Sequence, residues 1–240
     1  MNLYRFATYR KIMRLYHRIL ELLKGKQKYL YELNYWKKLK NERGNLPQFN
    51  FEYWYTKHFG IAPSFYKGKN ILDIGCGPLG SLEWADVCSC RIGLDPLARN
   101  YKAQRNFNHK MIYVAACSES MPFQDGVFDV ISSFNSLDHL DNLDRAISEI
   151  FRVLAPSGFF LLLVEVEHAP TVTEPIKLSW DIVARLAQFF EVLDEKHYEK
   201  ADGAGIYESI LYNIPYDHLD TRKRSGILSV KFKKLKITKS

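Results

Sequence analysis

The stretch NILDIGCGPLGS, residues 70–81, decides the fold of this 240-residue chain. Its glycines at positions 75, 77 and 80 match the G-x-G-x-x-G pattern, in which the absence of side chains lets the backbone approach a nucleotide cofactor closely. An apolar run with a single aspartate, residues 71–74, leads into the glycines and is typical of a buried strand. We therefore predict a β-strand that ends in a ligand-binding loop.

Three positions bear on which ligand this loop binds. Asp73 precedes Gly75 by two residues, where a carboxylate repels a pyrophosphate but suits a ligand with an ammonium group. Pro78 lacks the amide N–H that a phosphate would need. Asp95, at the end of the next predicted strand, can accept hydrogen bonds from both hydroxyls of a ribose. The pattern favours a positively charged adenosine cofactor and disfavours an NAD-dependent dehydrogenase.

Short apolar runs alternate with helical patterns from residue 70 onwards. They predict strands at 70–74, 91–95, 111–115, 128–133 and 158–165, followed by further stretches at 190–199 and 226–237. One helix is expected over 142–154, with Asp141 or Asn142 as its N-cap, and another over 180–190, capped by Ser179. Alternation of this kind is typical of an α/β fold, in which helices cover both faces of a largely parallel sheet.

The first 66 residues have a different character. Residues 3–24 carry an apolar stripe at helical spacing and several basic side chains, so they predict a helix that either packs on the adjoining domain or contacts an anionic membrane peripherally. Residues 29–66 mix aromatic and basic side chains, which suits a packed helical cap or, less readily, stacking on nucleic acid. We expect an N-terminal helical, aromatic-rich extension at 1–66 and a second domain at 67–240.

Charge is distributed unevenly along the chain. Residues 1–46 hold twelve Lys or Arg against three Asp or Glu, and residues 221–240 hold eight Lys or Arg and no acid. Because the whole chain carries +7, the central residues 47–220 carry −10. An acidic centre argues against a nucleic-acid backbone at the glycine loop, since phosphates are bound by Lys and Arg.

The four cysteines form neither a metal-binding nor a disulfide pattern. Cys88 and Cys90 are the closest pair, no CxxC motif occurs, and no histidine near them has zinc-ligand spacing. We expect reduced cysteines in a cytoplasmic protein and assign no metal ligands. No apolar run reaches the roughly 18 residues that a transmembrane helix needs, and the basic N-terminus lacks the pattern of a signal peptide.

Four segments occur in an order that points to a known family: ILDIGCG (71–77), GLDPL (93–97), SESMPFQDGVFDVISS (118–133) and EIFRVLAPSGFFLLL (149–163). Over residues 70–165 the chain resembles the class I S-adenosylmethionine-dependent methyltransferases, in particular the branch called methyltransferase type 11. The resemblance does not cover residues 1–66. It implies a Rossmann-like, seven-stranded, mostly parallel sheet, S-adenosylmethionine as the cofactor, and methyl transfer as the reaction.

The resemblance also implies a set of cofactor-binding residues at the ends of the strands. They are Asp73, Gly75, Cys76, Gly77, Asp95, Pro96, Leu97, Ser118, Glu119 and Asn135. Asp73 would line the methionine end of the cofactor, Asp95 would hold the ribose, and Asn135 would border the transferred methyl group. Cys117 stands where many relatives have an aspartate that accepts from the adenine amino group, so Ser118 or backbone would take over that contact.

Methyl transfer needs a positioned acceptor and, for a hydroxyl, a general base. In α/β sheets such groups lie beyond the carboxyl ends of the strands. We predict His139 as the base, oriented by Asp138 or Asp141, and Glu165 and His168 as contacts to a polar acceptor. The alternatives are that His139 packs against the following helix and that the other two belong to a solvated loop.

The expected acceptor is a hydroxyl or carboxylate of a small molecule or glycan precursor. The sequence NSLD (135–138) differs from the Asn/Asp-Pro-Pro-aromatic motif of methyltransferases that act on base amines. SFNSLDHLDNLD (133–144) and HAPTVTEP (168–175) resemble bacterial methyltransferases, some of them associated with surface-polysaccharide genes. The alternatives are an RNA methyltransferase that uses the basic termini and a membrane- or partner-binding module with a vestigial cofactor site.

Overall fold

The computed structural model describes residues 25, 27–39, 41, 50–103 and 108–235. The chain divides into two compact units, one comprising residues 1–46 with 171–173 and the other comprising 47–170 with 174–240. In the first unit residues 27–39 are helical, and Trp36 Nε1 donates a hydrogen bond of 2.8 Å to Glu32 Oε1 one turn earlier. The helix predicted over residues 3–24 lies outside the described residues.

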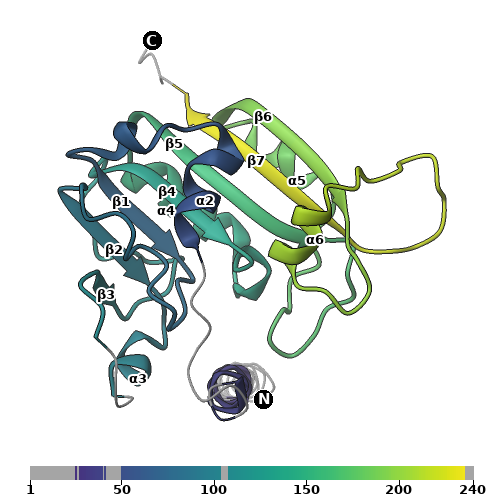
Figure 1. The fold of residues 1–240 in the computed structure, drawn as a ribbon, viewed down its shortest axis with the longest axis horizontal. Coiled ribbons are helices and arrows are strands. Elements are labelled where there is room, and N and C mark those ends of the chain that lie inside the picture. The colour runs from purple at the N-terminus through teal and green to yellow at the C-terminus, as the bar shows by residue number, and fades with distance from the viewer. Residues whose placement is uncertain (1–24, 26, 40, 42–49, 104–107, 236–240) are drawn as a thin grey trace, which may run out of the picture. The chain divides into compact units, whose positions relative to one another are not determined.

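The second unit contains a seven-stranded sheet with the strand order β3-β2-β1-β4-β5-β7-β6 (Figure 1). The strands are β1 Asn70–Ile74, β2 Cys90–Leu94, β3 Ile112–Val114, β4 Phe128–Phe134, β5 Leu154–Val166, β6 Phe190–Glu199 and β7 Gly226–Lys234. β1 to β5 pair in parallel, whereas β7 is antiparallel to both of its neighbours, β5 and β6. The predicted seven-stranded, mostly parallel sheet is therefore confirmed.

Short helices connect the strands. They are α2 Phe51–Tyr55, α3 Ala98–Lys102, α4 Leu143–Val153, α5 Ile182–Leu186 and α6 Ile206–Tyr212, with 3₁₀ turns η1 Lys57–Phe59, η2 Pro63–Tyr66 and η3 Leu137–His139. Asn142 is the N-cap of α4, as one of the two predicted alternatives has it, because its side-chain oxygen accepts from the amide of Arg145 at 3.0 Å.

A helix forms within the predicted range 180–190, but it is shorter than predicted and Ser179 is not its N-cap. α5 begins after Asp181, whose side chain makes no capping bond, and ends at Leu186. Phe190 instead starts β6, where it is buried against Phe160 and Phe232. Packing of this ring onto the sheet outweighs the local helical pattern.

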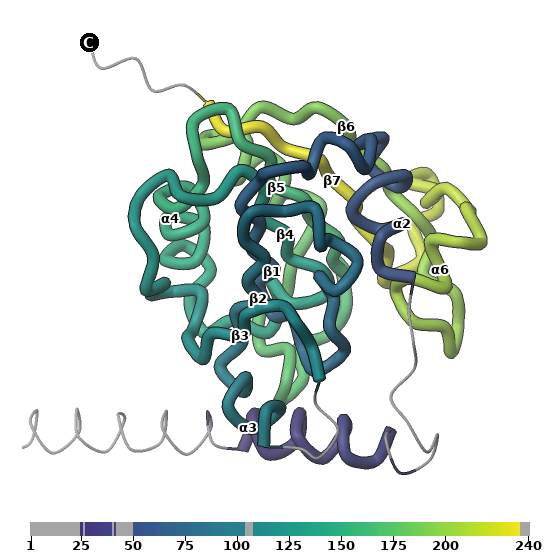
Figure 2. Tube along the Cα trace, turned by 60° about the vertical axis from the view of Figure 1, so that its left-hand side comes forward, coloured from purple at the N-terminus to yellow at the C-terminus, as the bar shows by residue number. Residues whose placement is uncertain are grey.

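Helices cover both faces of the sheet, as predicted (Figure 2). Because side chains alternate along a strand, each central strand contributes apolar groups to two separate cores. One core joins α4 and α5 to the sheet through Leu72, Ile74, Ile131, Ile147, Ile150, Val153, Leu162, Ile182 and Leu186. The other joins α2, η2 and α6 through Trp54, Tyr55, Tyr66, Ile71, Val130, Leu161, Leu163, Ile206 and Ile210.

The aromatic residues between 51 and 66 belong to this second core. Tyr55, Phe59 and Tyr66 are almost fully buried, and the Tyr66 hydroxyl donates to the carbonyl of Tyr55 at 2.5 Å. Lys231 Nζ, on β7, donates to the carbonyl of Phe59 at 2.8 Å. These rings pack against the sheet and are therefore unavailable for stacking on nucleic acid. Tyr31, in the first unit, is exposed.

The strand order places a crossover at the centre of the sheet. The chain runs from β1 outwards through β2 to β3 and then returns to the other side of β1 with β4. In such sheets ligands bind beyond the carboxyl ends of the strands, at the point where the order reverses. Here that point lies after β1 and β4. Within the described ranges, no helix has the length and apolar character to cross a bilayer.

Candidate active site

The loop after β1 passes very close to the loop after β4. Gly75 has a φ of +69°, and a Cβ atom at this position would lie 2.3 Å from the Cβ of Ser136. The Ser136 hydroxyl donates to the carbonyl of Ile74 at 2.8 Å, which joins the two loops. Only glycine fits such an approach in a left-handed conformation. Gly75 is therefore required by the crossover itself, in addition to any role in ligand binding.

Asp73, at the end of β1, is a buried carboxylate that two serines satisfy. Its Oδ2 accepts from the Ser81 hydroxyl at 2.5 Å and its Oδ1 from the Ser132 hydroxyl at 2.6 Å. Burial raises the pKa of Asp73 to about 6, against the opposing effect of these hydrogen bonds. The buried Tyr55 hydroxyl lies in the same environment, where burial and then the charge of Asp73 raise its pKa well above the usual value. The serines therefore hold this carboxylate in one orientation.

Asp95, beyond β2, holds the glycine loop. Its Oδ2 accepts from the amide of Gly77 at 3.1 Å and its Oδ1 from the amide of Leu97 at 2.8 Å. Cys76 points into the core, because a Cβ on Gly93 would lie 2.5 Å from its sulfur, and burial raises the pKa of its thiol. Four of the predicted cofactor residues are thus brought together around the ends of β1 and β2. Pro96 lies beside them and is exposed.

Glu119 connects the segment after β3 to the start of α4. Its Oε1 accepts from the amides of Asp141 and Asn142 at 2.9 and 3.2 Å, and its Oε2 accepts from the Ser118 hydroxyl at 3.2 Å. Asn135, directly after β4, is exposed and has a left-handed φ of +51°. These predicted cofactor residues therefore surround the carboxyl ends of β3 and β4.

Asp138, in η3, is bound by His168 rather than by the residue beside it. His168 Nε2 donates to Asp138 Oδ2 at 3.2 Å, and His168 Nδ1 lies 3.0 Å from the carbonyl oxygen of Ala169. Both neighbours are acceptors, so the ring is bound as an imidazolium, and the hydrogen bond to Asp138 raises the pKa of His168 to about 9. His168 therefore stays protonated at neutral pH.

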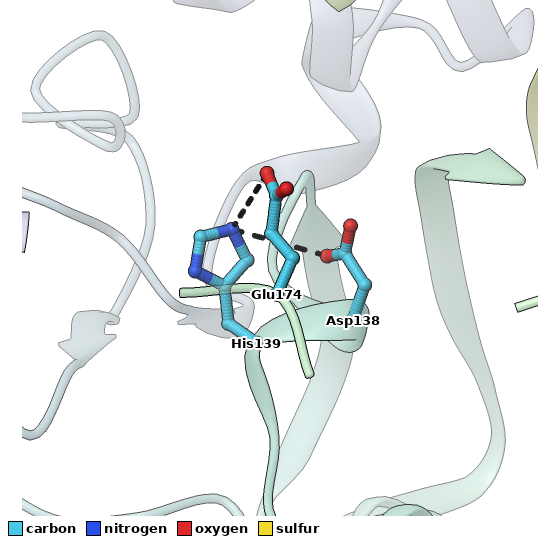
Figure 3. A group of neighbouring side chains, drawn as sticks. All are labelled: Asp138, His139 and Glu174. Carbon is cyan, nitrogen blue, oxygen red and sulfur yellow. Dashed lines mark ion pairs between the residues drawn. The ribbon is translucent and has the colours of Figure 1, made fainter. Parts of the chain in front are cut away.

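His139 lies between two carboxylates without a hydrogen bond to either (Figure 3). Its Nε2 is 3.9 Å from Asp138 Oδ1 and 3.7 Å from Glu174 Oε1. Within the described part of the chain, the buried atoms His139 Nε2 and Asp138 Oδ1 have no hydrogen-bond partner. Such orphaned polar atoms are costly and indicate a ligand or water at this point. Asp138 therefore lies close to His139, as predicted, but the two side chains are not hydrogen-bonded.

The remaining predicted residues are placed differently. Glu165, near the end of β5, lies 3.8 Å from Lys200 Nζ in the segment after β6. The backbone amide of Asp141, the second residue predicted to orient His139, is bound to Glu119. Glu165 is thus paired with a cation, which leaves its expected contact with a polar acceptor as a prediction.

The sequence analysis missed three residues that complete this region. Ser81 and Ser132 bind Asp73, and Glu174 faces His139. Two consecutive serines in an otherwise apolar predicted strand, ISS (131–133), are the signal that could have indicated a buried polar partner. Nothing in the local pattern indicates Glu174, because it lies in an irregular loop 35 residues after His139.

Comparisons with known proteins agree on the domain. A family model described as "Methyltransferase domain" matches residues 72–162. Sterol 24-C-methyltransferase of Schizosaccharomyces pombe is 32% identical over 117 residues, which cover 45% of this chain and 30% of that protein. Sterol 4-C-methyltransferase of Caenorhabditis elegans is 34% identical over 114 residues, covering 44% of this chain and 34% of that protein. The matched region thus spans about a third of these relatives.

Two solved structures share the fold. Geranyl diphosphate methyltransferase in complex with S-adenosylmethionine has a TM-score of 0.52 at 16% identity and covers 77% of this chain and 84% of its own. The [4+2]-cyclase SpnF has the same TM-score of 0.52 at 23% identity, covering 71% of this chain and 76% of its own. Because a cyclase and a methyltransferase share this architecture, the fold alone does not define the reaction.

Proposed function

We propose that this chain is a class I S-adenosylmethionine-dependent methyltransferase, which the family-model match over residues 72–162 supports, and that it transfers the methyl group of S-adenosylmethionine to an oxygen of a small molecule or glycan precursor. The observation that carries the proposal is Asp95, which holds the glycine loop through the amide of Gly77 at the point where the strand order reverses. S-adenosylmethionine supplies an electrophilic methyl group when bound, so the chain needs only to position an acceptor and handle its proton.

The proposed cofactor site follows the carboxyl ends of β1 to β4. Asp73, preoriented by Ser81 and Ser132, faces the ammonium group of the methionine moiety. Asp95, which holds the amides of Gly77 and Leu97 at the end of β2, would accept from the ribose hydroxyls. Ser118 borders the adenine, while Glu119 ties this segment to α4. Asn135 lies after β4, where the methyl group would be transferred.

The proposed acceptor site lies beside it, after β4 and β5. His139 Nε2, which lacks a hydrogen-bond partner within the described residues, is positioned to take the proton of an acceptor hydroxyl. Asp138 and Glu174 flank this nitrogen and would stabilise the imidazolium that forms. His168 is unsuited to the role of base because its raised pKa keeps it protonated. It instead offers a positive charge to a polar or acidic acceptor.

Calorimetric titration with S-adenosylmethionine tests the cofactor, with NAD and a short RNA as competing ligands. We expect S-adenosylmethionine alone to bind, and Asp95→Ala to weaken it at least tenfold, or about 1.4 kcal/mol. Asp129→Ala is the matched control, because Asp129 also binds a backbone amide, that of Asn70 at 2.9 Å, but at the amino ends of the strands. Equal losses in both variants, or no binding by the unmodified chain, would contradict the proposal.

Transfer of labelled methyl groups tests the acceptor. The panel contains small molecules with hydroxyl or carboxylate groups and nucleotide sugars. Total RNA is included to test the alternative that the chain is an RNA methyltransferase that uses its basic termini. We expect label in the small-molecule fraction and none in RNA. Label in RNA at low salt, lost as salt is raised, would favour the RNA methyltransferase instead.

A further inference from the structure

Asp138, His139 and Glu174 form a group whose donor atoms converge on one point (Figure 3). One ligand atom from each of the three residues lies within 4.8 Å of the other two. His139 Nε2 is 3.9 Å from Asp138 Oδ1 and 3.7 Å from Glu174 Oε1. In a tetrahedral site with bonds of about 2.0–2.2 Å, ligand atoms lie roughly 3.3–3.6 Å apart. Small side-chain rotations would close the observed distances to these values.

Asp138 gives an independent indication of a ligand. Its side chain is 1% exposed, and its Oδ1, which faces His139, has no hydrogen-bond partner among the described residues. Leaving a carboxylate oxygen buried and unsatisfied costs several kcal/mol unless something binds it. His139 Nε2 is orphaned in the same way. Two buried polar atoms that face each other without a hydrogen bond form an arrangement that a cation would satisfy.

The neighbourhood resembles the surroundings of known metal ligands. His168 binds the other oxygen of Asp138 at 3.2 Å, which turns Oδ1 towards His139, as hydrogen bonds to ligating carboxylates commonly do. The amide of Ile176 donates to the carbonyl of Asp138 at 3.2 Å and so fixes the loop that carries Glu174 against η3. Asp138 is closed to solvent, whereas the side chains of His139 and Glu174 are 25% and 30% exposed. An ion could therefore enter from their side.

We propose that Asp138, His139 and Glu174 bind a divalent transition-metal ion of the Zn²⁺ class. Imidazole nitrogen together with two carboxylate oxygens is a ligand set that such ions accept, and three protein ligands leave a position open for a further oxygen. This step rests on the proposed function: the oxygen at the open position is the hydroxyl of the methyl acceptor. The ion lowers the pKa of the bound hydroxyl, whose proton leaves to solvent, and the resulting alkoxide attacks the methyl carbon as the sulfur leaves with its electron pair.

The metal changes the role of His139. When Nε2 is a ligand, its lone pair is no longer available to remove a proton, so direct base catalysis and metal activation exclude each other. The sequence carries no sign of this group, because two ligands are adjacent and the third lies 35 residues further on, unlike the close spacings of zinc motifs.

Calorimetry of the metal-stripped full chain with Zn²⁺, and absorption spectra with Co²⁺, test the proposal without measuring activity. We expect one ion per chain, visible Co²⁺ bands, and at least tenfold weaker binding in Glu174→Gln. Glu167→Gln is the matched control, because Glu167 lies in the same loop but pairs with Lys177 at 3.3 Å. It should bind Zn²⁺ within about twofold of the unmodified chain.

Further outcomes separate this proposal from the proposed function. Zn²⁺ binding that is absent, or equally weakened in both loop variants, overturns the metal site. Because Glu174 is partly exposed, its variant remains informative even if Asp138→Asn fails to fold. S-adenosylmethionine binding is measured on the same samples. If S-adenosylmethionine binds and Zn²⁺ does not, only the proposed metal site is contradicted. If Zn²⁺ binds and S-adenosylmethionine does not, only the proposed methyl transfer is contradicted.

Discussion

Asp73 and Asp138 are carboxylates of nearly equal burial, 3% and 1% exposed; Asp73 lies near the end of β1, and Asp138 follows the neighbouring strand β4. Ser81 and Ser132 donate to both oxygens of Asp73. Asp138 has one partner, His168, and an open second oxygen within the described residues. On the glycine-loop side, defined by Asp73 and its serines, both carboxylate oxygens are therefore hydrogen-bonded within the chain, whereas on the Asp138 side one oxygen is not.

The difference indicates which side chains contribute mainly to the free energy of unfolding and which contribute mainly to ligand binding and turnover. The hydroxyls of Ser81 and Ser132 offset part of the cost of burying the Asp73 carboxylate, so replacing either serine destabilises the protein. An orphaned group costs stability and persists where something else requires it. We therefore expect substitutions of the serines that bind Asp73 to lower the free energy of unfolding, and substitution of His139 to alter ligand binding and turnover at little cost in stability.

Gly75→Ala is expected to have the largest effect, because it acts where the two sides meet. The new Cβ would combine a left-handed φ of +69° with a contact of 2.3 Å to Ser136, so unfolding free energy should fall by about 3 kcal/mol or more. Gly203→Ala is the control: its φ is +70°, but nothing lies within 4 Å, so it should cost only about 1–2 kcal/mol. Denaturant unfolding measures both, and equal losses would refute the close approach.

The pH dependence of stability should reveal Asp73. Its folded pKa of about 6 exceeds the ordinary value of 3.8, so between these pH values the folded state binds more protons than the unfolded state. Stability contributed by the protonated form is therefore present below pH 3.8 and is lost as pH rises through 6, by up to about 3 kcal/mol. Asp73→Asn should remove this dependence. A wild-type minus variant difference that is flat from pH 4 to 7 would contradict the assignment.

Ser132→Ala should lower unfolding free energy by about 1–2 kcal/mol, because it leaves Asp73 Oδ1 without the hydroxyl that donates at 2.6 Å. A double-mutant cycle with Asp73→Asn measures the coupling directly, and we expect about 1 kcal/mol. Ser120→Ala, at an exposed turn position, is the control and should change little. Additive losses in the cycle would mean that the serine acts through packing alone.

His139→Leu should have the smallest effect on stability, within about 0.5 kcal/mol, because it removes a polar atom that has no hydrogen-bond partner among the described residues. Methyl transfer should fall at least ~100-fold whether this nitrogen acts as a base or as a metal ligand. Thermal melts and labelled-methyl transfer on the same sample compare the two quantities. A large loss of stability with retained methyl transfer would contradict the prediction, because His139 would then act in folding and not in the reaction.

The sequence was sufficient for the sheet because periodic apolar runs report on burial directly. Residues 70–74 form β1 as predicted, and the β4 prediction differs by only one residue. The cluster around His139 could not be predicted, because Glu174 comes from a loop without periodicity. His139 does lie near Asp138, as adjacency in sequence predicted, but the hydrogen bond from His168 to Asp138 could not be foreseen because the two residues are 30 positions apart.

The position of β7 has a consequence for how the sheet is assembled. Residues 226–234 insert between β5 and β6, and among the described strands β6 pairs with β7 alone. During synthesis, the edges of β5 and β6 that β7 covers therefore stay open until residues 226–234 leave the ribosome. Unpaired edges of this length invite association with other chains. This half of the sheet is thus assembled only when β7 arrives, and until then the open strand edges expose the chain to aggregation.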